Sequence, residues 1–219
     1  ANDLSVFPSV VAEGHGGIAN VERVANLFLT KTFYALALAL AVGVGRLPFP
    51  FLPRHFTIIS ALTIGIPGFF LALAPNARLA RPGFLRRVLR FAIPAGIVAA
   101  VATFAAYLVA RAGTDDDLAE ARTVAVIVLF VVALWVLAFL SRPLTSWRGG
   151  IVVAMAVLFV GAFAIPFTRD YFALEVPDLE STLAAVGVGA LAGGLLQVGW
   201  HLSGWAPPPA NVTHDDHVA

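Results

Sequence analysis

The chain has 219 residues, of which 59% are hydrophobic and 12% are charged, and its formal net charge is +1. Soluble domains are about half apolar and about one quarter charged, so this composition excludes an ordinary water-soluble fold and indicates an integral membrane protein. The sequence has no cysteine, which excludes a disulfide framework, a thiolate metal site and a cysteine nucleophile. The near-neutral charge gives no indication of nucleic acid as a partner.

The beginning of the chain predicts a piece of a longer protein. It starts with alanine, and no signal-peptide pattern follows. We therefore expect a fragment, or the product of a gene truncated at its start. Residues 1–23 are interpreted as a short cytoplasmic lead to the first membrane span.

Six stretches are predicted to cross the membrane, since a helix needs about 20 apolar residues to span the hydrocarbon core. The predicted fold is an all-α integral membrane protein with a six-helix bundle over 24–202. The polar tail, 203–219, is expected to be disordered and cytoplasmic. The predicted spans are 24–45, 56–75, 90–111, 122–141, 149–167 and 182–202.

The arginines predict the orientation of the bundle. Basic residues gather in the loops after the second and fourth spans, and acidic residues gather in the loops after the third and fifth. Because arginine-rich short loops stay in the cytoplasm, both termini are expected to be cytoplasmic. The basic residues are Arg78, Arg81, Arg86, Arg87, Arg90, Arg142 and Arg148.

The first span carries polar residues that recur near helical period, so several of them share a face. These are Glu22, Asn26, Thr30 and Lys31. In one interpretation Lys31 extends to the cytoplasmic interface and Glu22 is an ordinary boundary charge. In the other, Lys31 stays inside the bundle as a fixed positive charge, with the neutral oxygens of Thr32 and Tyr34 near it.

The second span has a break near its centre, in the sequence "SALTIGIPGF". Pro67 has no N–H for the carbonyl of Thr63, and Gly65 adds local flexibility. Interrupted helices of this kind build ion sites in transporters, and the hydroxyls of Ser60 and Thr63 are ligands that hard cations accept. The alternative is a kinked packing helix whose hydroxyls bond to their own backbone.

The first 76 residues resemble the region that follows the phosphorylation domain of P-type cation-transporting ATPases. The resemblance rests on "VVAEGHGGIANVERVANLFLTKTFYALALAL" and "LPFPFLPRHFTIISALTIGIPGFFLALAPN". The sequences "NVERVANLFLTKT" and "ALTIGIPGFFLAL" are most similar to those of the bacterial subgroup that includes the actinobacterial calcium-uptake pumps. The six spans then correspond to the fifth to tenth helices of the family.

The resemblance implies a membrane-domain fragment of a pump that couples ATP hydrolysis to cation transport across the plasma membrane. By position, Thr32 and Ala35 match ion-binding places on the fifth helix of the animal calcium pumps. Ser60, Thr63 and Ile64 match those on the sixth. The expected ion path therefore includes Thr32, Ser60, Thr63, Gly65 and Pro67.

The chain departs from the animal pumps in its charges. Ala35 and Ile64 stand where those pumps use carboxylates, so either the missing fourth helix supplies the charge or the ion differs in identity or stoichiometry. Lys31 is a candidate built-in counter-ion that would replace a counter-transported one. These departures leave the transported metal unassigned.

The parts of the pump that do chemistry are missing from this sequence. "DKTGT", "TGES" and "GDGxND" do not occur, so the chain has no catalytic residue of its own and should neither bind nor hydrolyse ATP. ATP and Mg²⁺ belong to the full-length parent. The expected partners are the lipid bilayer, the transported cation and the missing N-terminal part of the same pump.

The sequence favours two other functions less. A stand-alone six-span channel or secondary transporter would be favoured by inverted repeats, which the sequence lacks. An intramembrane serine protease is disfavoured because His201 and Ser203 are two positions apart, so they do not face each other on a helix. The cluster of histidines and aspartates at 214–217 is interpreted as part of an acidic tail rather than a metal site.

Overall fold

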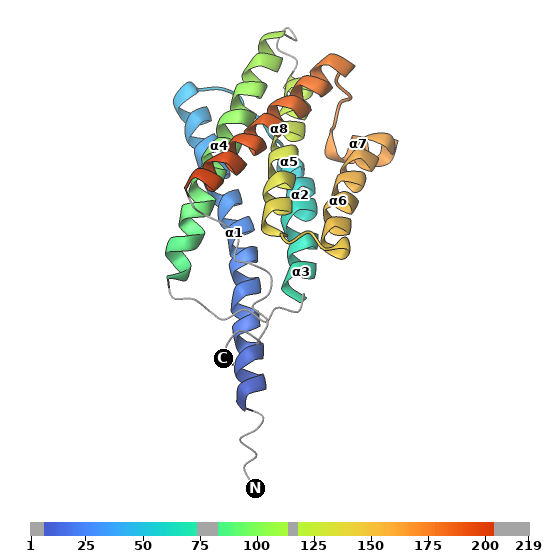
Figure 1. The fold of residues 1–219 in the computed structure, drawn as a ribbon. Helices are drawn as coiled ribbons and strands as arrows, with labels where there is room; N and C mark the ends of the chain where they lie inside the picture. The colour runs from blue at the N-terminus through green and yellow to red at the C-terminus, as the bar shows by residue number, and fades with distance from the viewer. Residues whose placement is uncertain (1–6, 74–82, 114–117, 204–219) are drawn as a thin grey trace.

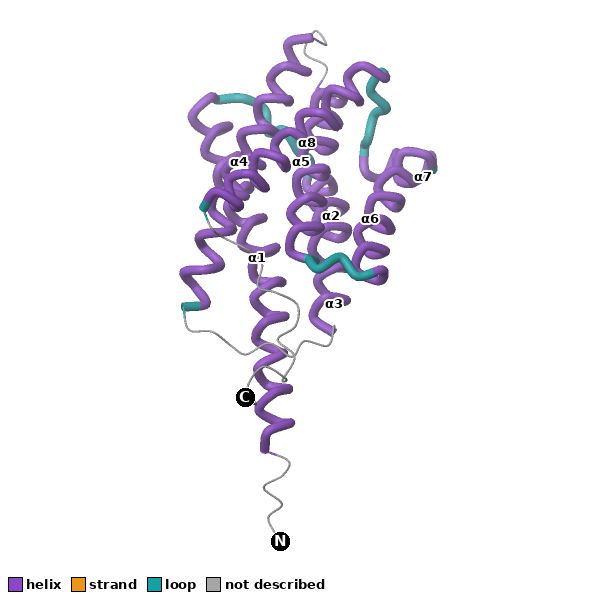
Figure 2. Tube along the Cα trace, in the orientation of Figure 1, coloured by secondary structure: helices purple, strands orange, loops and turns teal. Residues whose placement is uncertain are grey.

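The computed structural model describes residues 7–73, 83–113 and 118–203; these ranges are mostly helical, with short connecting loops and no strand among them (Figures 1 and 2). The expected acidic tail, with its histidines, follows Ser203 and lies outside the described residues. Arg78 and Arg81, between the second and third spans, also lie outside them. The helices are α1 (Phe7–Gly45), α2 (Pro53–Ser60), η2 (Ala61–Gly65), α3 (Ile66–Leu73), α4 (Phe84–Gly113), α5 (Leu118–Leu140), α6 (Ser146–Ala164), α7 (Pro166–Phe172) and α8 (Leu179–Leu202).

Six segments of the described chain are long and apolar enough to cross a membrane, which confirms the predicted all-α, multi-pass fold. Each segment begins a few residues before the predicted span, because helices continue past the apolar core into the polar boundary. The segments are Asn20–Gly45, Pro53–Leu73, Phe84–Ala112, Leu118–Leu140, Ser146–Ala164 and Leu179–Leu202.

The helix α1 is one continuous helix of 39 residues that extends beyond the bundle toward the N-terminus (Figure 1). We call the end of the bundle where α1 leaves it the lower end, as it is drawn in Figure 1. α1 packs most extensively against α4 and also contacts α3 and η2. These contacts place the polar residues of α1 between two neighbouring segments of the bundle.

The centre of the bundle is α5, whose side chains are mostly buried by α4, α8, α6 and η2. The face of α8 that meets α5 is built from small residues. A Cβ added at Gly193 would lie 2.5 Å from Cγ of Trp135, so only glycine permits this approach. Close packing of this kind holds helices together in lipid, where burial of apolar surface gives little net drive.

Aromatic rings join α4, α5 and α8 in one stack. The ring centroids of Phe91 and Trp200 are 4.3 Å apart, and those of Phe139 and Trp200 are also 4.3 Å apart. Beside the stack, Gln197 Oε1 accepts hydrogen bonds from Trp135 Nε1 at 3.2 Å and from Arg142 Nη2 at 3.3 Å. The stack and this amide therefore fix α8 against the central helix.

Hydrogen bonds to loop carbonyls close the upper end of the bundle. The Tyr107 hydroxyl donates to the carbonyl of Pro48 at 3.0 Å, and Arg122 Nε donates to that of Phe49 at 3.2 Å. Nearby, Arg54 Nη1 donates to the carbonyl of Tyr171 at 3.0 Å and so links α2 to α7. These contacts hold the upper end of the second span in a fixed position.

Candidate functional site

The second span is continuous but irregular at its centre. It consists of α2, the π-helix η2 and α3, and the N–H of Ile66 reaches back five residues to the carbonyl of Ala61. The sequence predicts a break at Gly65 and Pro67, whereas the structure has a widened turn that remains helical. The wider turn accommodates Pro67, because its ring no longer has to stack directly on the carbonyl four residues earlier.

The two hydroxyls of this span have different surroundings. Thr63 is buried, and its Oγ1 donates to the carbonyl of Ile59 at 2.8 Å, which is the local bond of a packing helix. Ser60 Oγ is buried and has no hydrogen-bond partner among the described residues. Of the two candidate ligands, Ser60 therefore has the hydroxyl that is not already engaged.

The backbone around Pro67 supplies a further acceptor. Pro67 is buried and has no N–H, so one backbone carbonyl loses its helical hydrogen-bond donor. In an α-turn this is the carbonyl of Thr63, and in a π-turn it is that of Leu62. Gly65 is exposed on the other side of the turn. A carbonyl without a donor inside a membrane needs a neighbour, a water or an ion.

On α1, the residues singled out for an ion path lie at the surface of the described chain. Thr32 is exposed, and its Oγ1 donates to the carbonyl of Phe28 at 3.0 Å. Lys31 is half-buried and makes no hydrogen bond or ion pair with a described residue. No hydrogen bond among the described residues joins Thr32 to Ser60 or Thr63.

A different set of polar residues occupies the buried side of α1. Asn26, Thr30 and Tyr34 are each spaced by four residues, so they share one face, and each is at most 4% exposed. Asn26 Oδ1, Thr30 Oγ1 and the Tyr34 hydroxyl have no hydrogen-bond partner among the described residues. The four-residue spacing of polar groups inside an apolar span is the sequence signal that identifies this stripe.

The stripe lies at a level where α4 approaches α1 closely. A Cβ added at Gly96 would lie 2.4 Å from Cβ of Phe33, 3.0 Å from the N atom of Tyr34 and 3.1 Å from the carbonyl oxygen of Thr30. The backbones of the two helices therefore nearly touch at the level of Thr30 and Tyr34. Such close contact leaves little space between the helices for bulk water, although single buried waters can satisfy polar atoms.

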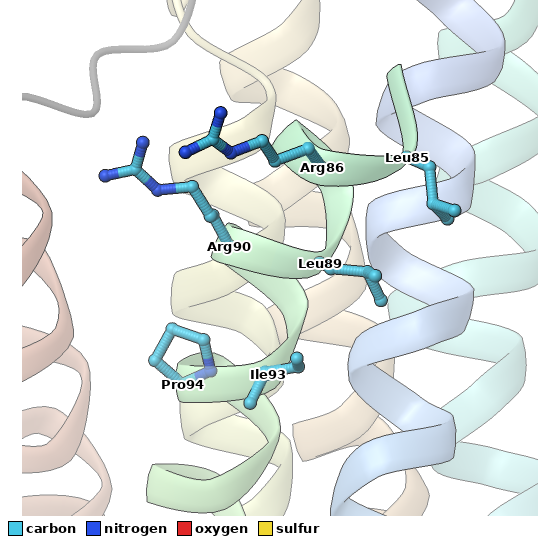
Figure 3. Close-up of a pocket in the computed structure, with 6 residues that line it drawn as sticks. All are labelled: Leu85, Arg86, Leu89, Arg90, Ile93 and Pro94. Carbon is cyan, nitrogen blue, oxygen red and sulfur yellow. The ribbon is translucent and has the colours of Figure 1, made fainter. Parts of the chain in front are cut away.

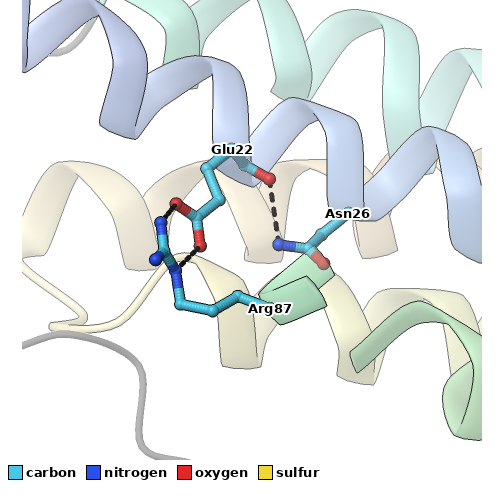
Figure 4. A network of polar contacts seen from close by, with 3 residues as sticks. All are labelled: Glu22, Asn26 and Arg87. Atoms are coloured by element: carbon cyan, nitrogen blue, oxygen red, sulfur yellow. Dashed lines mark hydrogen bonds and ion pairs between the residues drawn. The ribbon is translucent and has the colours of Figure 1, made fainter. Parts of the chain in front are cut away.

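The lower end of the stripe is closed by an ion pair (Figure 4). Arg87 of α4 donates through Nε to Glu22 Oε1 at 3.0 Å and through Nη2 to Oε2 at 2.8 Å. Asn26 Nδ2 donates to the carbonyl of Glu22 at 2.9 Å, and Asn20 Nδ2 donates to that of Ala72 at 3.0 Å. Glu22 is thus a partner of α4 as well as a boundary charge.

The chemistry that these groups offer is neutral oxygen. The described residues contain no group of three or more histidine, aspartate or glutamate side chains that could hold a metal ion. Acidic residues within the described spans occur only in the first turns, at Glu22, Glu120 and Glu180. The chain can therefore contribute hydroxyl, amide and carbonyl ligands to a cation path but little negative charge at membrane depth.

Sequence comparison relates almost the whole chain to known transporters. It is 42% identical over 216 residues to the calcium-transporting ATPase CtpE of Mycolicibacterium smegmatis, which covers 93% of this chain and 27% of that protein. It is 43% identical over 212 residues to CtpE of Mycobacterium tuberculosis, covering 91% of this chain and 27% of that protein.

A more distant relative has a broader name. The chain is 30% identical over 203 residues to the probable cation-transporting ATPase exp7 of Streptococcus pneumoniae, covering 85% of this chain and 25% of that protein. No protein-family model matches the chain. The chain thus spans about a quarter of the length of these relatives. Together with the six-helix membrane fold, the comparisons confirm the resemblance: the chain belongs to the P-type cation-transporting ATPases and corresponds to their C-terminal membrane part.

Proposed function

We propose that this chain forms part of the membrane path of an ATP-driven cation pump, with Ca²⁺ as the cargo. The observation that carries the proposal is the 42% identity, over 93% of the chain, to a protein named as a calcium-transporting ATPase. ATP and Mg²⁺ would act in an N-terminal part of the same pump, outside this sequence. By itself the chain would neither bind nor hydrolyse ATP.

The second span would provide ligands at mid-membrane. Ser60 offers a hydroxyl without a partner, and the π-turn before Pro67 offers a carbonyl without its helical donor. Thr63 could add an oxygen lone pair while keeping its bond to Ile59. Gly65, on the exposed side of the turn, would let another helix of the pump approach closely.

The first span would provide one ligand and one charge. Thr32 is exposed on α1 and would face the helices that the chain does not include. Lys31, half-buried and unpaired among the described residues, would act as a built-in counter-ion beside the path. Since neutral oxygens alone balance a divalent charge poorly, carboxylates from the missing part would complete the site.

The pump would lie in the plasma membrane with both termini of this chain in the cytoplasm. The support is the arginine content of the lower end, where Arg86, Arg87 and Arg90 begin α4 and Arg142 and Arg148 flank the turn before α6. Arginine-rich short loops are retained on the cytoplasmic side during insertion.

The test uses the full-length pump in sealed vesicles, with Ca²⁺-dependent ATP hydrolysis and Ca²⁺ uptake as readouts. Ser60→Ala and Pro67→Ala are expected to raise the Ca²⁺ concentration for half-maximal activity by about tenfold, the cost of one lost ligand. Thr57→Val is the control, because the exposed Thr57 bonds only to its own backbone at Pro53. Activity that depends on another cation and ignores Ca²⁺ would refute the proposed cargo.

Two further measurements separate this proposal from its rivals. Lys31→Ala should change the ATPase activity or its dependence on the ion, and an unchanged variant would remove the counter-ion role. The 219-residue chain alone, in liposomes, should conduct no Ca²⁺. Steady flux without ATP would instead identify a six-span channel or secondary transporter.

A further inference from the structure

Three arginines in the first two turns of α4 have two different environments. Arg87 turns to α1 and pairs with Glu22 through both carboxylate oxygens. Arg86 and Arg90, one helical turn apart, are exposed and extend side by side away from α1 (Figure 3). Neither makes a hydrogen bond or ion pair with a described residue. Two adjacent guanidinium groups are thus free to bind an anion.

An open groove of about 460 Å³ continues from these arginines along α4. Its other walls are Leu85, Leu89, Ile93 and Pro94, which give it an almost entirely aliphatic lining (Figure 3). Leu85 is 62% exposed and Ile93 is 37% exposed, so a ligand can reach both side chains from outside the described chain. The groove therefore combines a doubly positive end with an apolar track.

The position of the groove in the span determines which part of it lies among the lipid headgroups and which part among the acyl chains. The span begins at Phe84, so Arg86 and Arg90 lie within its first two turns, at the level of the lipid headgroups. Ile93 and Pro94 lie one turn farther in, at the level of the acyl chains. A molecule that matches this order has an anionic head and a hydrocarbon tail.

We propose that this groove is a binding site for one anionic phospholipid. Its phosphate lies between the guanidinium groups of Arg86 and Arg90, which match phosphate oxygens in charge and geometry. Leu85 and Leu89 flank the head at the level of the arginines, and one acyl chain lies along Ile93 and Pro94, one turn deeper. A free phosphate ion would use only the charged end, and a lipid without phosphate only the apolar end. A zwitterionic phospholipid offers the same phosphate, but the two guanidinium groups repel its own cation, so the anionic phospholipid is the ligand that fits both ends.

The site is tested on the 219-residue chain in neutral detergent by native mass spectrometry. Phosphatidylglycerol and phosphatidylcholine with identical acyl chains are titrated separately, and the fraction of protein carrying one lipid is measured. An arginine near a lipid phosphate contributes about fivefold in affinity, so the pair predicts a preference for phosphatidylglycerol on the order of tenfold or more. An equal fraction with both lipids would overturn the proposal.

Matched variants separate this groove from general surface charge. Arg86→Gln with Arg90→Gln should reduce the preference to about twofold, whereas Arg86→Lys with Arg90→Lys should keep most of it. Arg148→Gln removes a charge elsewhere in the chain and should leave the preference unchanged. If Arg148→Gln lowers the preference as much as Arg86→Gln with Arg90→Gln does, the attraction is unspecific and the site is refuted.

The apolar end has its own test. Ile93→Trp fills the track without changing charge and should weaken phosphatidylglycerol binding severalfold. Inorganic phosphate at millimolar concentration should not displace the lipid. Full retention of the lipid by Ile93→Trp, or its displacement by phosphate, would mean that the arginines bind a bare anion and would overturn the lipid assignment. Each variant is first compared with the parent chain by helical circular dichroism.

Discussion

Arg87 of α4 holds Glu22 of α1 through two parallel hydrogen bonds, at 3.0 Å and 2.8 Å. The two residues are 65 positions apart in sequence, and both side chains are partly shielded, at 31% and 17% exposure. Charge-assisted, bidentate bonds of this kind are among the stronger polar contacts in proteins. The pair fixes the lower end of the most extensively packed helix pair in the described chain.

Breaking this pair is expected to destabilise the bundle. Arg87→Gln leaves the Glu22 carboxylate without its partner, which costs about 1–3 kcal/mol. Arg86→Gln removes the same charge one residue away and should change stability little. The measurement is thermal unfolding in detergent. In a double-mutant cycle, Glu22→Gln with Arg87→Gln should cost less than the sum of the single changes; strict additivity would contradict a direct interaction.

The close approach of α4 to α1 predicts that Gly96 tolerates no side chain. Gly96→Ala would place a methyl group 2.4 Å from Cβ of Phe33, so the helices must separate. Over-packing of this kind costs about 1–3 kcal/mol. Gly187→Ala is the control, since nothing lies within 4 Å of its added Cβ, and it should stabilise α8 by up to about 1 kcal/mol. Equal unfolding temperatures for the two variants would contradict the contact.

The unpartnered stripe on α1 predicts a stabilising substitution. The buried hydroxyl of Tyr34 has no partner among the described residues, so Tyr34→Phe should leave stability unchanged or raise it by up to about 1–3 kcal/mol. Tyr107→Phe is a matched control, because it loses the bond to the carbonyl of Pro48 and should cost about 0.5–1.5 kcal/mol. If Tyr34→Phe destabilises the chain as much as Tyr107→Phe, a bound water or ion satisfies the Tyr34 hydroxyl.

The start of α8 predicts a dependence on acid. Hydrogen bonds from Ser181 hold the pKa of the exposed Asp178 carboxyl below its usual range; the larger effect comes from the serine side chain, and the serine N–H adds to it by donating to Asp178 Oδ1 at 3.0 Å. A carboxyl whose pKa is lower in the folded than in the unfolded state stabilises the fold when the pH is above its unfolded-state pKa of about 3.9. This stability is lost as the pH falls through the folded-state pKa.

Asp178→Asn keeps a good N-cap but does not titrate, so it should flatten this part of the pH profile of α8. Hydrogen exchange of the first turn of α8, compared at neutral pH and below pH about 4, is the measurement. The same acid sensitivity in both proteins would assign it to another group.

The sequence was sufficient for the architecture and the family, because both depend on features that are local in the chain. Apolar runs long enough to span a bilayer predict helices directly, and the six predicted spans are present. The two stretches within the first 76 residues resemble the family by sequence alone, and the comparisons with known ATPases agree with this resemblance.

The site was less predictable because it depends on which faces of the helices meet. The break predicted at Gly65 and Pro67 is a π-turn, since one extra residue in the turn relieves the proline ring without unwinding the helix. Thr32 and Lys31 could not be distinguished from Thr30 by spacing alone, yet Thr30 is buried against α4 and Thr32 is exposed. The pairing of Glu22 with Arg87 needs the packing of α1 on α4, which no local pattern encodes.

The unbroken length of α1 has a mechanical consequence. At 1.5 Å per residue, its 39 residues form a rod of about 58 Å. Arg87 and Gly96 contact α1 at two levels, near Glu22 and near Thr30, so the part of α1 between these contacts cannot change its angle to α4 without breaking one of them. The rod and α4 would tilt together as a lever, and the neighbouring π-turn of the second span, the least regular part of the described bundle, would be the place that yields.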